Sequence, residues 1–218
     1  MSRNLNDLLK WSIENTTRGE DAPADGAAAP SSDSIRNLDP ELLSALMGGP
    51  SDAELMQAAM SLITSDDPDV THESRVTAFD NFEQLIESLD NANNMSNLAL
   101  WTPLVSLLDH SHPDLRRYAA WCVGTAVQNN APSQERFHSE GGVPKLVALA
   151  AGDDEKDREV KRKAVYALSS AVRNYQPAMD VAHEELGKLG LSADREKVDA
   201  TDMDAIDEIM ARLRERLQ

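Results

Sequence analysis

Cysteine, aromatic residues and positive charge are all scarce in this chain of 218 residues. Its single cysteine, Cys122, excludes an intramolecular disulfide framework. Aromatic residues make up only 4% of the chain, which disfavours β-sheets, because strands are enriched in aromatic and β-branched residues. The 38 acidic residues outnumber the 21 basic ones and give a net charge of −17, which repels phosphate. We therefore expect neither nucleic acid nor an anionic membrane as a partner.

Long apolar runs and catalytic motifs are also missing. No run approaches the roughly 18 residues that a membrane-spanning helix needs, and the first residues lack the apolar stretch of a secretory signal. There is no GxSxG, HExxH or CxxC motif, and no i,i+4 histidine pair that could begin a metal site. We expect a cytoplasmic protein that is not an enzyme, holds no metal or cofactor, and keeps Cys122 buried. The five histidines are His72, His110, His112, His138 and His183.

The first 38 residues fall into two segments of different character. Residues 1–17 contain a short amphipathic helix, which we interpret either as a terminal helix docked on the body or as a partner-binding motif. The apolar residues of this motif include Leu8, Leu9, Trp11 and Ile13. Residues 18–38 are rich in Gly, Ala, Pro, Ser and Asp, and are predicted to be a disordered linker, because they cannot bury enough surface to offset chain entropy.

Two helix starts follow this linker. Asp39-Pro40-Glu41 combines a capping acid, a proline in the first turn and a second acid at the positive end of the helix dipole. Ser51-Asp52-Ala53-Glu54 has the pattern of a capping box. The second helix is predicted to bury a stripe formed by Leu55, Ala58, Ala59, Leu62 and Ile63.

A helical unit of about 40 residues then repeats along the chain. Arg75, Ala78, Phe82, Leu85 and Ile86 match Arg116, Ala119, Val123, Ala126 and Val127 at an offset of 41 residues. Leu115, Ala119, Val123, Ala126, Val127 and Asn129 match Val160, Ala164, Leu168, Ala171, Val172 and Asn174 at an offset of 45. The extra residues fall in the charged loop around 153–157, where an insertion costs least. The period predicts an all-α fold, a short armadillo- or HEAT-like right-handed superhelical solenoid over residues 39–176.

Residues 177–218 are predicted to be a connection followed by a capping helix. The apolar face of this helix holds Met203, Ile206, Met210, Leu213 and Leu217. Acids fill its first half and arginines its last turns, which complements the helix dipole. A helix of this kind would cover the open end of the stack, and we expect a monomer.

Amide side chains gather where the predicted repeat helices end. Asparagine is a natural residue for ending a helix, so capping explains part of this pattern. Stacked along one rim, the same amides would also offer donors and acceptors to a partner, and both interpretations stay open at the level of sequence. The helix-end residues are Asn91, Ala92, Asn93, Asn94, Gln128, Asn129, Asn130, Arg173 and Asn174.

Positive charge is concentrated in one part of this acidic chain. Residues 136–176 hold 8 basic and 6 acidic residues, whereas residues 1–70 hold 4 basic and 13 acidic ones. Lys161, Arg162, Lys163 and Arg173 therefore form a basic island. It is either a solvated helix face or a patch that attracts an acidic protein surface.

Several long strings in the sequence resemble one family, the armadillo-type nucleotide-exchange factors of 70-kDa heat-shock chaperones, in its fungal cytosolic branch. These strings are residues 78–94, Leu100-Trp101-Thr102-Pro103-Leu104, Gly124-Thr125-Ala126-Val127-Gln128-Asn129-Asn130 and residues 163–170, together with Leu8-Leu9-Lys10-Trp11-Ser12-Ile13 at the start. The resemblance covers roughly residues 1–17 and 39–176.

The resemblance implies a co-chaperone rather than a catalyst of bond-making. Such factors grip one lobe of the chaperone's nucleotide-binding domain and displace the other, so that ADP leaves. It implies that Asn91, Ala92, Asn93 and Asn94 contact the chaperone, with Gln128, Asn129, Asn130, Arg173 and Asn174 continuing the rim. It also implies that a bulky residue at Ala92 would block binding without unfolding the protein. The alternative is a generic armadillo adaptor that does not alter ADP release.

Overall fold

The computed structural model describes residues 50–191 and 197–216 of the chain. The chain divides into two units, Met1–Ser51 and Asp52–Gln218, and every helix among the described residues belongs to the second unit. The predicted N-terminal motif with Leu8, Leu9, Trp11 and Ile13, the linker 18–38 and the helix start at Asp39 lie outside the described residues.

Every regular element among the described residues is a helix, so the predicted all-α class is confirmed. None of these helices is long and apolar enough to cross a membrane. In chain order they are α4 (Asp52–Ile63), α5 (His72–Ile86), α6 (Leu89–Asn94), α7 (Trp101–Ser106), the 3₁₀ helix η2 (Leu107–Asp109), α8 (Pro113–Val127), α9 (Ala131–Ser139), α10 (Gly142–Ala151), α11 (Arg158–Val172), α12 (Gln176–Lys188) and α13 (Met203–Glu215).

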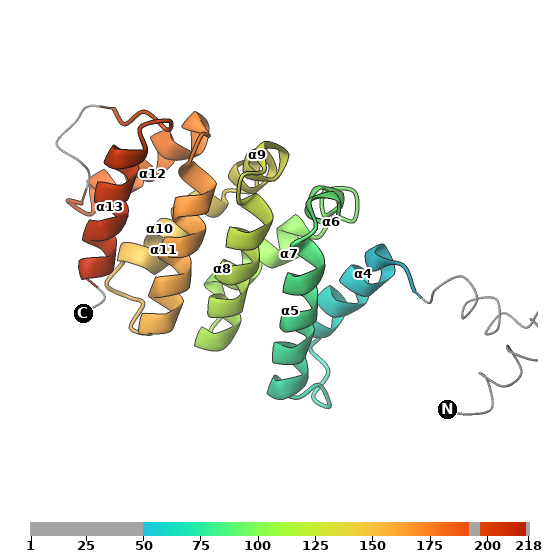
Figure 1. Cartoon of the computed structure of the whole chain (residues 1–218). Coiled ribbons are helices and arrows are strands. Elements are labelled where there is room, and N and C mark those ends of the chain that lie inside the picture. Colours follow the sequence, from blue (N-terminus) through green and yellow to red (C-terminus); the bar gives the residue numbers. More distant parts are fainter. Residues whose placement is uncertain (1–49, 192–196, 217–218) are drawn as a thin grey trace, which may run out of the picture. The chain divides into compact units, whose positions relative to one another are not determined.

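Three helices of 15 residues each, α5, α8 and α11, stand side by side and mark the repeat (Figure 1). They begin at residues 72, 113 and 158, which are steps of 41 and 45, as the sequence offsets predict. The loop before α11 runs over 152–157, whereas the corresponding loop before α8 is only 110–112. Three of the four extra residues therefore lie in the charged loop, and the described part of the chain is a stack of armadillo-like units.

Close packing of α8 against α11 depends on Gly124. A Cβ atom built at this position would lie 2.4 Å from a ring carbon of Tyr166 and 3.1 Å from the Cα of Ala167. Both distances are too short for an ordinary contact, so only glycine lets the two helices approach this closely without a shift. The small residues Ala126 and Ala171, also named by the repeat, are fully buried in the same core.

One continuous core runs through the stack and includes Cys122, which is fully buried. Burial raises the pKa of the Cys122 thiol well above its ordinary value, and the nearby carboxylates of Glu83 and Asp80 act in the same direction. Glu83 is itself only 5% exposed, and its Oε1 accepts a 2.7 Å hydrogen bond from the Thr125 hydroxyl. This bond ties α5 to α8 inside the core.

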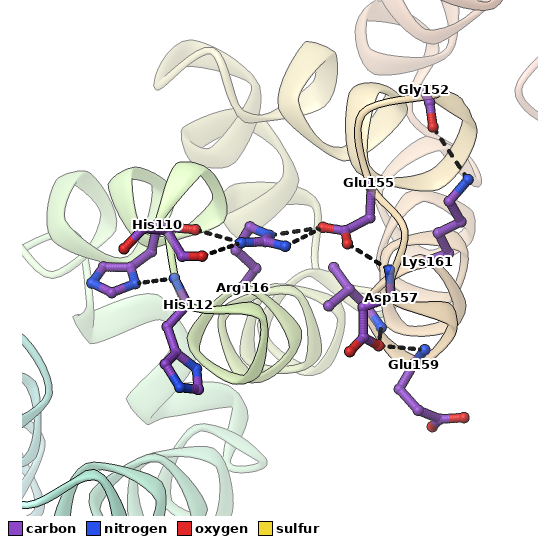
Figure 2. A network of polar contacts seen from close by, with 10 residues as sticks. His110, His112, Arg116, Gly152, Glu155, Asp157, Glu159 and Lys161 are labelled. Carbon is purple, nitrogen blue, oxygen red and sulfur yellow. Dashed lines mark hydrogen bonds and ion pairs between the residues drawn. The ribbon is translucent and has the colours of Figure 1, made fainter.

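A cation near the start of each repeat helix donates to backbone carbonyls of the loop before it. Arg75 donates to Ser65 O at 2.7 Å, and Lys161 donates to Gly152 O at 3.2 Å. Arg116 donates to His110 O at 2.7 Å and to Ser111 O at 2.9 Å, and it also reaches Glu155 (Figure 2). A loop clamp of this kind therefore recurs in each of the three repeats, at positions 75, 116 and 161.

The predicted apolar stripe of α4 is partly wrong. The structure buries Ala59 and Ile63 as expected, but Ala58 is exposed, and Leu55 and Leu62 are 41% and 37% exposed. The other two buried positions are Met56 and Met60. Both stripes have helical spacing, so the sequence alone does not decide which of them is buried.

At the other end of the unit, α13 packs against α11. Ile206, Met210 and Leu213 are buried, as the sequence predicts, and Leu217 lies outside the described residues. Asp202 precedes the helix and accepts a 3.0 Å hydrogen bond from Ala205 N, which satisfies one backbone donor at the start of the helix.

Candidate functional site

The exposed side of α8 and α11 carries two aromatic rings and a lysine between them. Lys163 Nζ lies 3.7 Å from the centre of the Trp121 ring and 5.9 Å from that of Tyr166. Both rings are partly exposed. Burial lowers the pKa of Lys163, and the nearby Arg162 guanidinium lowers it further. Trp and Tyr are the residues that contribute most often to the energy of protein interfaces.

A hollow of about 560 Å³ opens beside these rings, between the end of α8, the length of α11 and the end of α13. We call it the basic hollow, because four arginines and no carboxylate line it. The Tyr166 hydroxyl donates a 3.2 Å hydrogen bond to Gln128 Oε1, which fixes the amide at its edge. The lining residues are Gln128, Asn129, Arg158, Arg162, Tyr166, Ser169, Ser170, Arg173 and Arg214.

The arginines of the basic hollow differ in how firmly they are held. Arg173 donates to Ser169 Oγ at 3.1 Å and forms an ion pair with Asp207 of α13, so it is tied in place. Arg162 is 64% exposed and pairs with Glu159 on its own helix. A site that combines firmly held and exposed guanidinium groups in a chain of net charge −17 favours an acidic ligand surface.

Asn129 and Asn174 hold equivalent turns after α8 and α11. Both residues have left-handed backbone, with φ of 51° and 58°, a region in which asparagine is far more common than most other residues. Both side chains are exposed, and Asn174 N donates to Ala200 O at 2.8 Å. Capping therefore accounts for why asparagine stands at these two positions, while their side chains remain accessible to a partner.

Asn130 has a structural role that its neighbours do not share. It is 3% exposed, and its Nδ2 donates to Ser133 Oγ at 2.8 Å and to Ala126 O at 3.2 Å. It stands at the start of α9 and joins that helix to the end of α8. The expectation that its amide faces a partner is wrong, because the side chain is enclosed by the junction between the two helices.

The amides of the first repeat lie on a separate short helix, α6, and not at the end of the repeat helix as the sequence suggests. The α5 helix ends at Ile86, and Asn91 Nδ2 donates to Leu85 O at 2.9 Å and to Asp52 Oδ2 at 2.8 Å. Ala92 is only 2% exposed, so it belongs to the core. Asn93 is exposed, and Asn94 is partly exposed and accepts a hydrogen bond from Asn97.

Of the predicted rim residues, Gln128, Asn129 and Arg173 meet at the basic hollow, with Asn174 next in the chain. The four positions on α6 do not line it. Within the basic island, Arg162 and Arg173 line the hollow, Lys163 lies over Trp121, and Lys161 turns to Gly152 instead.

Sequence reasoning missed Trp121, Tyr166, Arg158 and Arg214 as surface residues of this site. Trp121 and Tyr166 are 45 residues apart and therefore occupy equivalent repeat positions, as Gln128 and Arg173 do. This offset is the signal that could have revealed the aromatic pair. Arg214 offers no such signal, because it reaches the hollow only through the packing of α13.

The stacked helices and their polar, arginine-lined face define a class, the armadillo-like repeat proteins. The model of the family described as nucleotide exchange factor Fes1 matches residues 5–95, and that of the SIL1/FES1/HPBP1 C-terminal domain matches residues 91–204. The chain belongs to this Fes1/SIL1/HPBP1 family.

Curated fungal relatives match nearly the whole chain. The Hsp70 nucleotide exchange factor fes-1 of Neurospora crassa is 52% identical, with 99% of this chain and 98% of the relative covered. The Hsp70 nucleotide exchange factor FES1 of Gibberella zeae is 58% identical over 98% of this chain and 96% of its own length. The crystal structure of an engineered protein matches with a TM-score of 0.53 at 19% identity, covering 84% of this chain and 76% of that one, and this likeness concerns the fold alone.

Proposed function

We propose that this protein is a nucleotide exchange factor of Hsp70 chaperones, a co-chaperone that promotes the release of ADP. The observation that carries the proposal is the similarity to relatives that bear this name, 50–58% identical over nearly the full length of both chains. This similarity spans all the described repeats of the stack.

The proposed contact surface is the side of α8 and α11 that carries Trp121, Tyr166 and the basic hollow. Its support is chemical. Two partly exposed aromatic rings can provide buried contact area, and four arginines can pair with carboxylates on the chaperone. Asn93, Gln128, Asn129 and Asn174 extend the surface with exposed amides. Asn130 and Ala92 are left out of this surface because their side chains are buried.

In this proposal the protein acts by binding and makes or breaks no covalent bond. A factor that binds the open, weakly nucleotide-binding form of the chaperone more tightly than the closed form shifts the population toward the open form. By linkage, ADP must then bind the chaperone–factor complex more weakly by the same factor. A stack of packed helices suits this task, since a rigid surface does not adapt to both forms equally well.

Stopped-flow release of a fluorescent ADP analogue from an Hsp70 nucleotide-binding domain tests the activity. We expect the full chain to accelerate release by about tenfold or more at saturation, within the usual range of allosteric coupling. Binding without any acceleration would instead identify an armadillo adaptor. Hydrolysis of ATP by the chain alone would contradict the proposal that the protein makes and breaks no covalent bond.

Charge reversal tests the surface separately from the activity. Arg162→Glu combined with Arg214→Glu places two negative charges in the basic hollow, and we expect affinity for the chaperone to fall by about tenfold or more. Arg212→Glu combined with Lys188→Glu makes the same charge change at exposed positions outside the hollow and serves as the matched control. Equal losses in both variants would point to general electrostatics and contradict the assigned surface.

The remaining parts of the proposal are a monomeric state and a cytoplasmic location. Light scattering of the purified chain at micromolar concentration tests the first, with a single mass near 23.9 kDa as the expected result. Fluorescence microscopy of a tagged chain expressed at native level in a fungal cell tests the second.

A further inference from the structure

Two histidines and an aspartate that lie far apart in the sequence meet on the surface where α5 and α8 begin. His72 is the first residue of α5, His112 precedes α8, and Asp114 is in the first turn of α8. One ligand atom from each of the three side chains lies within 4.8 Å of the other two. His72 Nε2 lies 3.1 Å from Asp114 Oδ2, and the two imidazole ring centres are 4.4 Å apart.

Neighbouring contacts orient these side chains toward one another. Arg117 holds Asp114 Oδ1 at 3.0 Å, which leaves Oδ2 facing His72. His110 Nδ1 accepts a 3.0 Å hydrogen bond from His112 N and so fixes the turn before α8. Figure 2 shows the His112 ring pointing away from Arg116 and its carboxylate partner, so this ring takes no part in the loop clamp.

The chemistry of the three groups matches one kind of ligand. Two imidazoles and one carboxylate are a common ligand set for Zn²⁺ and similar first-row cations, which bind at about 2.0–2.2 Å and leave a fourth position to water. Such bond lengths place tetrahedral ligand atoms roughly 3.3 Å apart. The His72–Asp114 separation already fits, and the second imidazole needs only a small side-chain shift. His72 and Asp114 are 45% and 39% exposed, so a cation from solvent can reach them.

We propose that His72, His112 and Asp114 bind a first-row divalent cation, with Zn²⁺ as its representative, at the contact between the first two repeats. The cation links α5 to α8 through groups that do not touch the basic hollow, so this inference does not depend on the proposed function. Its effect is to hold the two repeats at a fixed spacing at the ends of the helices opposite the Thr125–Glu83 hydrogen bond.

Calorimetric titration of the untagged full chain with Zn²⁺, after chelator treatment and in excess Mg²⁺, tests the site. Mg²⁺ occupies loose carboxylate clusters but prefers oxygen ligands in octahedral geometry, so it leaves the histidine site free. We expect one Zn²⁺ per chain and a higher melting temperature on binding, because a ligand of the folded state stabilises it. Co²⁺ in place of Zn²⁺ should give visible absorption typical of a four-coordinate nitrogen and oxygen site.

Single substitutions identify the ligands. His72→Ala and His112→Ala should each weaken Zn²⁺ binding by about tenfold or more, because even the loss of an outer-shell partner costs that much. Asp114→Asn should weaken it as well. The matched control His138→Gln, which removes a histidine elsewhere in the chain, should bind Zn²⁺ as the wild type does. Absence of one-to-one binding in the wild type, or wild-type affinity in either histidine variant, would overturn the proposal.

Discussion

Arg116 and Glu155, 39 residues apart in the chain, form an ion pair that joins the start of α8 to the loop before α11. Arg116 Nε and Nη2 both lie 2.7 Å from Glu155 Oε2, and the two side chains are 17% and 3% exposed. The second carboxylate oxygen accepts a 2.8 Å hydrogen bond from Asp157 N. One acid therefore satisfies a guanidinium and orders the loop at the same time.

We predict that Glu155→Ala lowers the free energy of unfolding by about 3 kcal/mol, since it leaves a largely buried guanidinium without its charge partner. Urea denaturation followed by circular dichroism measures the change. Asp153→Ala removes an acid of the same loop whose side chain is 93% exposed, and we expect it to be close to neutral. Equal effects of the two substitutions would show that the buried ion pair between Arg116 and Glu155 contributes nothing to the free energy of unfolding.

The substitution Gly124→Ala has two opposing effects on stability, a gain from helix propensity and a loss from packing. Alanine gains roughly 1 kcal/mol over glycine in a helix interior, whereas forcing a methyl group into a packed contact costs about 1–3 kcal/mol. Because the new Cβ would lie 2.4 Å from the Tyr166 ring and 3.1 Å from backbone, we expect a net loss of stability of about 1 kcal/mol. When Tyr166 is already replaced by alanine, adding Gly124→Ala should cost much less stability than it does in the wild type. A more stable single variant in thermal melts would contradict the close approach of α8 and α11.

Ala92→Arg should unfold part of the stack rather than only block a partner. Ala92 is 2% exposed, so an arginine there buries a charge that has no partner. We expect a clear fall in melting temperature together with the loss of chaperone binding. Asn93→Arg places the same side chain on the exposed neighbour and should leave the melting temperature unchanged. Loss of binding in Asn93→Arg alone would identify the surface of α6 as a contact.

Cys122 should be unreactive in the folded protein. Its thiol is fully buried, and burial raises its pKa well above the ordinary value, so the reactive thiolate is not formed near neutral pH. We expect a thiol reagent to modify it only at the rate at which the core opens, and at once in denaturant. The same raised pKa means that stability is complete below the pKa of the unfolded thiol and falls as pH rises beyond it. Cys122→Ala removes the contribution of this thiol to the loss of stability at alkaline pH. If stability depended on pH in the same way in the variant and the wild type, this prediction would be contradicted.

Much of the fold could be predicted because apolar residues recur at equivalent positions of successive repeats. The offsets of 41 and 45 residues gave the starts of α8 and α11 relative to α5, and they also located the lengthened loop. The stripe of α4 was harder to predict, since two apolar stripes lie next to each other on that helix, and only the packing of the folded chain decides between them.

The candidate site was only partly predictable for a related reason. Gln128, Asn129 and Arg173 follow helix ends, which a periodic sequence reveals. Burial of Asn130 depends on α9 packing beside the end of α8, and the histidine–aspartate cluster depends on the distance between two helix starts. Neither distance is encoded in local spacing, because His72 and His112 are 40 residues apart along the chain.

The lengthened loop before α11 makes the two inter-repeat contacts unequal. It supplies the acid that pairs with Arg116, whereas Nε of the equivalent Arg75 is buried with no hydrogen-bond partner among the described residues. α8 also packs more extensively on α11 than on α5. On heating, this solenoid should accordingly begin to unfold at the contact between α5 and α8, and the carboxy-terminal half should stay folded longest. The inserted loop thus confines early unfolding to one end of the stack.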